Sequence, residues 1–393
     1  MAASEQLEEV EVDSTRALIH HWRVFRISGL HPPDGNTWWG RHYRIYSAVW
    51  NLIFHICLSV SFGVNFLLSN SLETFCESLC VAMPHTLYML KMVNVERMRP
   101  QMLHSHRVLR CLDKRLSSEQ ERSIIREGVA RAEYINVQTG RGFASVVIIG
   151  ILYIAMSSER TLMYPSWVPW NWQSGSTSVF LATVIAHTLA LGENAMTVHN
   201  LSIYPGTYLI LLSVHTKALA LRVSRLGHDS HQTREETHQL LIGCIRDHQT
   251  ILQLFQLLER SLSMTCFLQF FCTACIQCTI CYFLIFERIG MMRFLNLVAL
   301  LGGLTTETLL LCYTAELVCQ EGDNLLAAGY NCNWLEQSVH FRRMLVLMLL
   351  RCQKPLILVA GIVVPVRMRT FLVVCKGAYT MLTLLNEMRK SEY

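Results

Sequence analysis

The sequence predicts an all-α membrane protein with seven transmembrane helices. The 25 residues from Leu262 to Phe286 contain no Asp, Glu, Lys or Arg, and roughly 20 apolar residues are enough to cross a hydrocarbon core of about 30 Å. Apolar residues make up 52% of the chain and charged residues 16%, with a mean hydropathy of +0.30. This composition fits a soluble globular protein poorly. Loops rich and poor in Lys and Arg also alternate along the chain, as they do in proteins that cross a membrane repeatedly.

Six more apolar windows accompany the first. The second, fourth and sixth windows each contain one acid, at Glu77, Glu193 and Glu307. A single acid is tolerated because insertion depends on the hydropathy summed over the whole helix. The seven windows, in order, are Ile45–Leu68, Thr74–Leu90, Gly142–Ser158, Val179–Leu212, Leu262–Phe286, Phe294–Ala315 and Phe371–Met388.

The distribution of positive charge predicts the orientation. Segments 1–44, 94–141, 217–260 and 321–354 hold 25 Lys and Arg residues, whereas the loops of the alternate set hold three. Positive loops face the cytoplasm, so we expect the N-terminus inside and, after seven crossings, the C-terminus outside. This is the reverse of a G-protein-coupled receptor. The chain also lacks the acidic-Arg-aromatic triplet and the Asn-Pro-x-x-Tyr motif of that class.

Composition also weighs against other classes. The N-terminal residues are acidic and resemble no signal peptide. Most of the 15 cysteines lie inside the apolar windows, where we expect packed thiols rather than disulfides. The formal net charge is +5, without a basic stripe interleaved with aromatic residues, so we expect no nucleic-acid partner.

Four cysteines in the fifth window have the every-third spacing of metal ligands. They are Cys272, Cys275, Cys278 and Cys281. On a helix each step of three residues turns the side chain by about 300°, and the four sulfurs would spread along about 13 Å of axis. They therefore cannot converge on one ion, and the spacing favours helix-packing residues over a metal site.

Three other motifs have competing interpretations. The histidine-containing loop Gly227–Gln239 has the composition of a solvated loop, and no second metal-binding motif accompanies it. Glu193 lies in an apolar window, and the sequence leaves open whether it is functional or simply faces the bundle interior. The segment Leu300–Thr308 contains two adjacent glycines but no lysine. It is therefore not a phosphate loop, and its small residues favour close helix approach or a bend.

The C-terminal region divides at two prolines. Leu345, Met348, Leu349 and Cys352 have the i, i+3, i+4, i+7 spacing of an amphipathic helix. The last window is unusually polar, and either one face lines a water-filled pore or its polar groups snorkel and bond to the helix backbone. These polar residues are Lys376, Thr380, Thr383, Asn386 and Glu387.

Several of these segments resemble the insect odorant receptor family, in its ligand-binding, tuning type. The N-terminal HHWRVFRISGLHPP (His20–Pro33) is similar to the family's Trp-Arg and Gly-Leu opening. CYTAELVCQEGDNLLAAGYNCNWLE (Cys312–Glu336) is similar to its signature after span six. RCQKPLILVAG (Arg351–Gly361) and TFLVVCKGAYTMLTLL (Thr370–Leu385) resemble its C-terminal block. The last motif differs from the family's Tyr-Ser-x-Phe at Tyr379–Leu382.

The resemblance implies a receptor subunit that binds small volatile odorants and gates a nonselective cation channel. Its expected partners are a common co-receptor subunit, in a heterotetramer, and the lipid bilayer of the plasma membrane in olfactory dendrites. Carried over by position, the expected organisation is a cytoplasmic segment at 1–44, six spans with the odorant pocket at 45–318, a cytoplasmic anchor at 319–366, and a pore-lining helix with a short outer tail at 367–393.

The resemblance also implies two sets of functional residues. The pore helix would be Thr370–Met388, with Leu384 and Met388 at an apolar constriction and Glu387 beside it. Lys376, Thr380 and Thr383 would complete the pore set. The odorant pocket would lie in the outer and middle parts of spans two, three, four and six, with Met83, His85, Tyr88, Ile149, Tyr153, Met156, Phe180, Val184, His187, Leu191, Thr305 and Thr306 as candidates.

Rival functions are a G-protein-coupled receptor, a membrane transporter and a membrane enzyme. The spans show no obvious inverted repeat of the transporter kind. The chain also contains no nucleophile elbow, metal triad or paired-acid motif, so we expect neither catalysis nor a cofactor.

Overall fold

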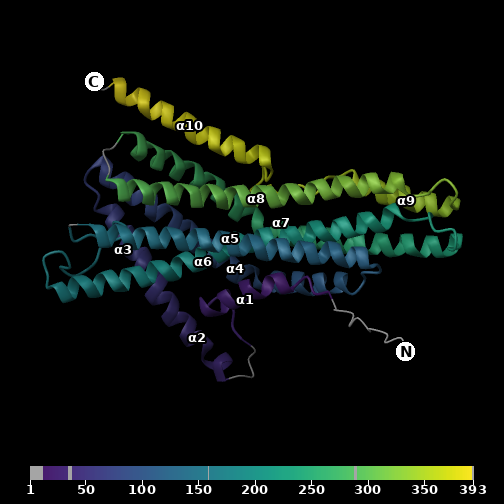
Figure 1. The fold of residues 1–393 in the computed structure, drawn as a ribbon, viewed down its shortest axis with the longest axis horizontal. Helices are drawn as coiled ribbons and strands as arrows, with labels where there is room; N and C mark the ends of the chain where they lie inside the picture. The colour runs from purple at the N-terminus through teal and green to yellow at the C-terminus, as the bar shows by residue number, and fades with distance from the viewer. Residues whose placement is uncertain (1–11, 34–37, 158, 287–289, 392–393) are drawn as a thin grey trace, which may run out of the picture.

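The structure is a computed structural model that describes residues 12–33, 38–157, 159–286 and 290–391. It is a bundle of long helices with a short β-hairpin before the last helix (Figure 1). The elements, in order, are α1 (Arg16–Ile27), α2 (Trp38–Trp50), the π-helical segment η1 (Asn51–Ile56), α3 (Cys57–Leu67), α4 (Leu72–Asp113), α5 (Glu119–Met156), α6 (Thr177–Ser224), α7 (Arg234–Phe286), α8 (Met291–Asn331), α9 (Val339–Cys352), β1 (Val359–Ala360), β2 (Val364–Pro365) and α10 (Met368–Ser391).

The central helices are much longer than a bilayer requires. α7 has 53 residues and α6 has 48, so at 1.5 Å per residue α7 is about 80 Å long, against a hydrocarbon core of about 30 Å. The bundle therefore combines a membrane-embedded part with a helical extension. The extension includes α9, at the right of Figure 1, and we call this end of the molecule the α9 end.

Within the described residues, five helical stretches are long and apolar enough to cross a membrane. They are Trp38–Leu67, Glu119–Met156, Thr177–Ser224, Arg234–Cys281 and Phe294–Asn331. The predicted windows at Thr74–Leu90 and Phe371–Met388 form helices α4 and α10 but are not among the five. Charged residues such as Lys91 and Lys376 lower the hydropathy of both helices.

α6 is the central helix of the bundle. Side chains are buried around its whole circumference from Leu201 to Leu212, apart from the half-buried Gly206, which is typical of a helix surrounded by others. It packs against α5, α7, α8 and α1. Helix α6 therefore forms one wall of any cavity near the middle of the bundle.

The N-terminal segment is tied to this core. The ring of His21 on α1 bonds to Asn200 Oδ1 (2.6 Å) and Thr207 Oγ1 (3.0 Å) of α6. Before α1, the backbone N–H and hydroxyl of Ser14 donate to Asp113 Oδ2 at 3.0 and 2.8 Å. α1 is therefore part of the folded bundle.

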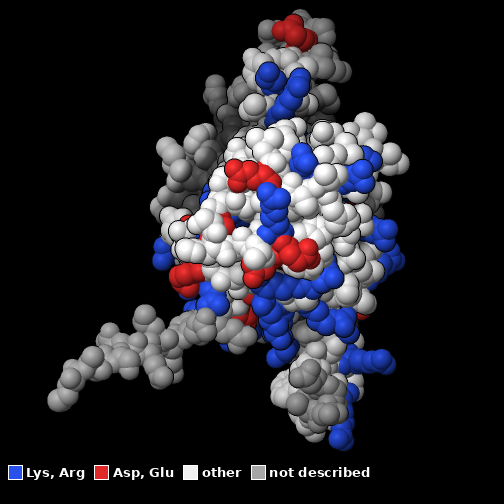
Figure 2. Space-filling model, turned by 90° about the vertical axis from the view of Figure 1, so that its right-hand side faces the viewer, with Lys and Arg blue, Asp and Glu red and all other residues white. Residues whose placement is uncertain are grey.

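Among the described residues, a cluster of ionic contacts lies toward the α9 end. Arg222 bridges two acids, with Nη2 2.6 Å from Glu121 Oε2 and Nη1 2.7 Å from Asp247 Oδ2. Figure 2 views this end and shows many more basic than acidic side chains around its rim. Exposed Arg342 and Arg343 on α9 belong to this surface.

Helix α9 has the amphipathic character that its spacing predicts. Leu345, Met348 and Cys352 are buried against the bundle and Leu349 is half-buried. The opposite face is also apolar in part, because Val339, Val346, Leu347 and Leu350 are more than half exposed in the single chain.

The last helix begins at a β-hairpin. β1 pairs antiparallel with β2, and Gly361 in the turn has a φ of 63°, a backbone conformation that favours glycine. Two bonds from Arg367 to Glu316, at 2.7 and 3.1 Å, fasten the start of α10 to α8. From there α10 packs on α7 and α8 and diverges from the bundle toward its C-terminal end (Figure 1).

Candidate functional site

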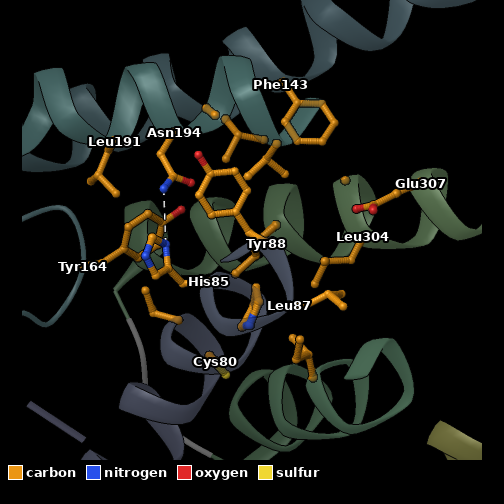
Figure 3. Close-up of a pocket in the computed structure, with 18 of the residues that line it drawn as sticks. Cys80, His85, Leu87, Tyr88, Phe143, Tyr164, Leu191, Asn194, Leu304 and Glu307 are labelled. Carbon is orange, nitrogen blue, oxygen red and sulfur yellow. Dashed lines mark hydrogen bonds between the residues drawn. The ribbon is translucent and has the colours of Figure 1, made fainter. Parts of the chain in front are cut away.

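An apolar cavity lies among helices α3 to α8. Its volume is about 180 Å³, and most of the side chains that line it are apolar. An apolar cavity of roughly 150 Å³ holds a benzene molecule, so this one suits a small organic ligand. Among the residues that line it are Phe62, Pro84, Leu87, Phe143, Val147, Leu191, Val198, Ile276, Gly303 and Leu304, several of which are drawn in Figure 3.

A proline on α4 and a glycine on α8 help to form the cavity. Pro84 removes one backbone hydrogen bond from α4 where it lines the space. On α8, a Cβ added at Gly303 would meet no atom within 4 Å. The sequence indicated close helix approach or a bend at Gly303. Instead its missing side chain leaves room in the cavity.

One part of the cavity wall is polar, and its side chains are hydrogen-bonded to neighbouring residues. Asn194 Nδ2 lies 3.2 Å from His85 Nδ1, the contact drawn in Figure 3. The other ring nitrogen of His85 lies 2.8 Å from the hydroxyl of Ser59. Tyr88, beside His85, bonds to the ring of His55 at 2.8 Å. These groups have protein partners already, so they give the cavity wall a fixed shape.

Glu193 lies behind this wall. Its Oε1 accepts from Trp50 Nε1 at 3.1 Å and from Thr197 Oγ1 at 2.9 Å, and its Oε2 lies 3.6 Å from His55. Its side chain is 7% exposed. The sequence left open whether Glu193 is functional or simply faces the bundle interior. In the structure its carboxylate faces the bundle interior, has polar partners and does not line the cavity.

A second polar contact borders the cavity near Leu304 (Figure 3). Lys91 on α4 forms a buried ion pair with Glu307 on α8. Ser202 of α6 joins it, donating to Glu307 Oε1 at 2.6 Å and accepting from Lys91 Nζ at 3.3 Å. The ion pair compensates the acid in the sixth window and connects three cavity-forming helices.

The sequence-predicted pocket residues are distributed over several places. His85, Tyr88 and Leu191 line the cavity, and Tyr153 lines a neighbouring chamber. Met83 packs against Ile276 and Phe283, whereas His187 is buried and bonded to Ser166 at 2.9 Å. Thr305 accepts from Gln277 at 3.0 Å. Ile149, Phe180 and Val184 are half-buried outside the cavity lining, and Met156 and Thr306 are exposed.

Sequence reasoning missed several cavity residues. Lys91 lies one position beyond the second apolar window, and Tyr164 lies in a loop that the window analysis does not cover. Phe62 comes from the first span, which the resemblance did not include in the pocket. The signals available were the acid Glu307 in the apolar sixth window and the polar Asn194 beside Glu193.

The predicted pore residues lie on α10. Lys376, Thr380, Thr383 and Glu387 are exposed on the single chain. The two threonine hydroxyls bond to backbone oxygens of α10 itself, at 3.0 and 2.7 Å. The side chains of Leu384 and Met388 lie outside the part of the chain that the structure describes.

The four spaced cysteines are distributed along α7. Cys278 is buried, and Cys272 packs against the buried cluster that contains Ile276 and Ile280. No group of three or more His, Cys, Asp or Glu side chains placed to hold a metal occurs among the described residues.

Comparison with known proteins identifies the family. The family model described as "7tm Odorant receptor" matches residues 71–379. The chain is 66% identical over 381 residues to Odorant receptor 19a of Drosophila melanogaster, covering 97% of this chain and 98% of that one. It is 65% identical over the same length to Putative odorant receptor 19b of that species.

Solved structures show the same fold. The insect olfactory receptor OR5 from Machilis hrabei matches with a TM-score of 0.80 at 16% identity, covering 94% of this chain and 97% of that one. The structure of that receptor in complex with eugenol matches with a TM-score of 0.79 at 17% identity, covering 96% of this chain and all of that one. Taken together with the long apolar helices and the full-length match to Odorant receptor 19a, the family match shows that this chain belongs to the insect odorant receptor family.

Proposed function

We propose that this chain is an odorant-binding subunit that holds a small apolar volatile in the cavity among α3 to α8. The family is one of membrane receptors and not of enzymes. The observation that carries the assignment of the site is the cavity itself, which is lined mostly by apolar side chains and is about 180 Å³ in volume. Such a space favours a ligand that is mostly hydrocarbon, because polar atoms there would lose water without gaining partners.

Binding is proposed to open a nonselective cation channel formed with a common co-receptor subunit. Two features of the single chain support this. The apolar outer face of α9, with Val346 and Leu347 more than half exposed, offers an interface to other subunits as part of an anchor. The exposed polar side chains of α10, Lys376 and Thr380 among them, suit a helix that faces water in an assembled pore.

The proposed orientation places the α9 end in the cytoplasm. The 25 Lys and Arg residues of the positive segments lie largely toward this end, whose basic rim is seen in Figure 2. The N-terminus would then be cytoplasmic and the C-terminus extracellular, in the plasma membrane of olfactory dendrites. An epitope at residue 2 should be labelled only after permeabilisation. Labelling in intact cells would contradict the orientation.

The function is tested by recording currents from cells that express this chain with the co-receptor. A panel of volatile hydrocarbons, alcohols, aldehydes and esters should include agonists, and the currents should persist when G proteins are inhibited. A G-protein-coupled receptor would lose the response under inhibition, and a transporter would give no channel-like current–voltage relation. Cells with the co-receptor alone are the control.

The site is tested by residue changes in the cavity wall. Tyr88→Phe and Asn194→Ala should change the rank order of agonists, because both side chains line the cavity. The response to an agonist that acts directly on the co-receptor should stay unchanged. Thr306→Ala is the matched control, since Thr306 is exposed outside the cavity lining. An unchanged rank order in the first two variants would contradict the site.

A further inference from the structure

A second chamber adjoins the apolar cavity. It has a volume of about 320 Å³ and a much larger polar share of surface, with Asn65, Glu77, Arg160 and Asn296 in its wall. We call it the vestibule. These residues lie at the end of α3, the start of α4, the α5–α6 loop and the start of α8, so the vestibule is at the end of the membrane part opposite α9.

A short stretch of the α5–α6 loop separates the two chambers. Met163 and Tyr164 line both of them, so they lie in the wall between. The other shared residues, Cys80, Val81 and Leu300, belong to helices α4 and α8. The loop is the part of this wall that can move without unpacking a helix. We call residues 160–167 the strap.

The strap is fastened on both sides of the partition. Arg160 Nη1 donates to the carbonyl oxygens of Gln173 and Gly175, at 3.0 and 2.6 Å. On the other side, Ser166 bonds to His187 at 2.9 Å. The backbone N–H of Trp167 also donates to Ser61 O at 3.2 Å. Met163 lies between these hydrogen bonds, and its side chain has no polar atom that can donate one. A change of its rotamer would therefore break none of the strap's hydrogen bonds.

Met163 occupies a notch that only glycine leaves open. A Cβ added at Gly150 on α5 would lie 2.0 Å from Met163 Cε and 2.6 Å from its sulfur. Met163 is 4% exposed and packs with Phe62 and Leu191. A methionine side chain has three rotatable bonds and adapts its shape easily. It is therefore suited to close the wall and to move aside.

Tyr164 completes the partition. In Figure 3 its ring lies next to His85 at one side of the cavity. The burial of Met163 comes from the tertiary fold, because its contacts are with other helices.

From this arrangement we propose that the strap is the access gate of the odorant cavity, with Met163 as the moving element, so that volatiles pass from the polar vestibule into the apolar cavity. This rests on the proposed function of the cavity. A gate that is crossed in both directions changes the rates of entry and exit by the same factor and leaves the equilibrium unchanged. A residue that only contacts the bound ligand changes mainly the exit rate.

The test is the kinetics of the current under rapid application and removal of the panel's strongest agonist. Met163→Ala should speed onset at low concentration about threefold or more, which corresponds to a barrier lowered by about 0.65 kcal/mol. Offset should be faster by at least the same factor, because Met163 also lines the cavity. Leu304→Ala, which alters the apolar cavity but not the vestibule and lies outside the cluster that contains Met163, should change offset far more than onset. Met196→Ala, on an exposed site of α6, should change neither.

Gly150→Ala tests whether the kinetic effect arises from the contact between Gly150 and Met163. It should alter both rates in the native chain, because the new methyl group displaces Met163, and have little effect in the Met163→Ala background. If Met163→Ala changes offset alone, as Leu304→Ala does, or changes neither rate, odorants reach the cavity by another route and the gate proposal is wrong.

A second measurement needs no agonist. A cysteine introduced by Leu304→Cys in the apolar cavity can be modified with methyl methanethiosulfonate, and the labelled peptide can be quantified by mass spectrometry against the native chain. Met163→Ala should raise the modification rate about threefold or more, and an unchanged rate would overturn the gate. If no volatile evokes current at all, the proposed function fails, whereas this labelling still decides the gate.

Discussion

The buried ion pair between Lys91 and Glu307 is expected to stabilise the cavity walls. Their side chains are 8% and 7% exposed, and Ser202 adds hydrogen bonds to both. Lys91→Met would leave Glu307 with the Ser202 hydroxyl but without its cation. Removing one partner of a buried pair costs roughly 3–5 kcal/mol, whereas replacing both partners with apolar side chains is often neutral or stabilising.

A double-mutant cycle measures this contribution. We expect Lys91→Met and Glu307→Met each to lower the free energy of unfolding by about 3–5 kcal/mol, and the double variant to differ from the native chain by about 1 kcal/mol or less. The assay is unfolding of the purified protein in mixed micelles with increasing denaturing detergent. Lys354→Met, at an exposed lysine, is the control and should stay within about 0.5 kcal/mol.

The expected coupling is contradicted if the effects of the two single substitutions on the free energy of unfolding simply add. If the double variant loses as much as the two single variants together, Lys91 and Glu307 do not stabilise each other and the contact in the structure has no energetic role. Loss of agonist response in the stable double variant would be a separate result. It would show that the charges act on the ligand or on gating as well as on the fold.

Three further predictions concern other regions. Gly128→Ala should destabilise the protein by about 1–3 kcal/mol, because its Cβ would lie 2.6 Å from Val214, whereas Gly243→Ala, with open space around it, should stabilise α7 by up to about 1 kcal/mol; thermal unfolding distinguishes the two, and equal effects would contradict the packing. Burial raises the pKa of Asp113 from 3.8 to about 6. Its neutral carboxyl group therefore contributes about 3 kcal/mol to the free energy of unfolding below pH 3.8, and this contribution is lost as pH rises through about 6. Asp113→Asn should flatten the stability–pH curve over that interval, and an unchanged curve would contradict the assignment. Glu387→Gln should shift divalent block or relative cation permeability with odorant sensitivity nearly unchanged, because a carboxylate near a pore mouth concentrates cations; unaltered permeation, measured with ion substitution and matched surface expression, would remove α10 of this subunit from the conduction path.

The helical architecture was largely predictable from the sequence because hydropathy is a local, additive property. The 25-residue window ending at Phe286 needs no knowledge of its neighbours, and five of the predicted spans lie in helical stretches that meet the length and apolarity of a membrane span. The buried face of α9 followed from the spacing of Leu345, Met348 and Cys352 for the same reason. Family resemblance added what local patterns do not contain, namely the kind of function.

The candidate site was less predictable because its key contacts join distant positions. Lys91 and Glu307 are 216 residues apart, and Trp50 and Glu193 are 143 apart. In the sequence each charged residue simply interrupts or borders an apolar window, and nothing shows that it contacts a distant partner. Likewise, nothing local to Met163 shows that its side chain lies against Gly150.

The most direct test of the proposed site is an experimental structure of the assembled receptor with its strongest agonist bound. We predict ligand density in the cavity among α4, α5, α6 and α8, in contact with Tyr88 and Leu191 and adjacent to the Asn194–His85 contact. Ligand density at α10 or at the lipid-facing surface, with the cavity empty, would contradict the account.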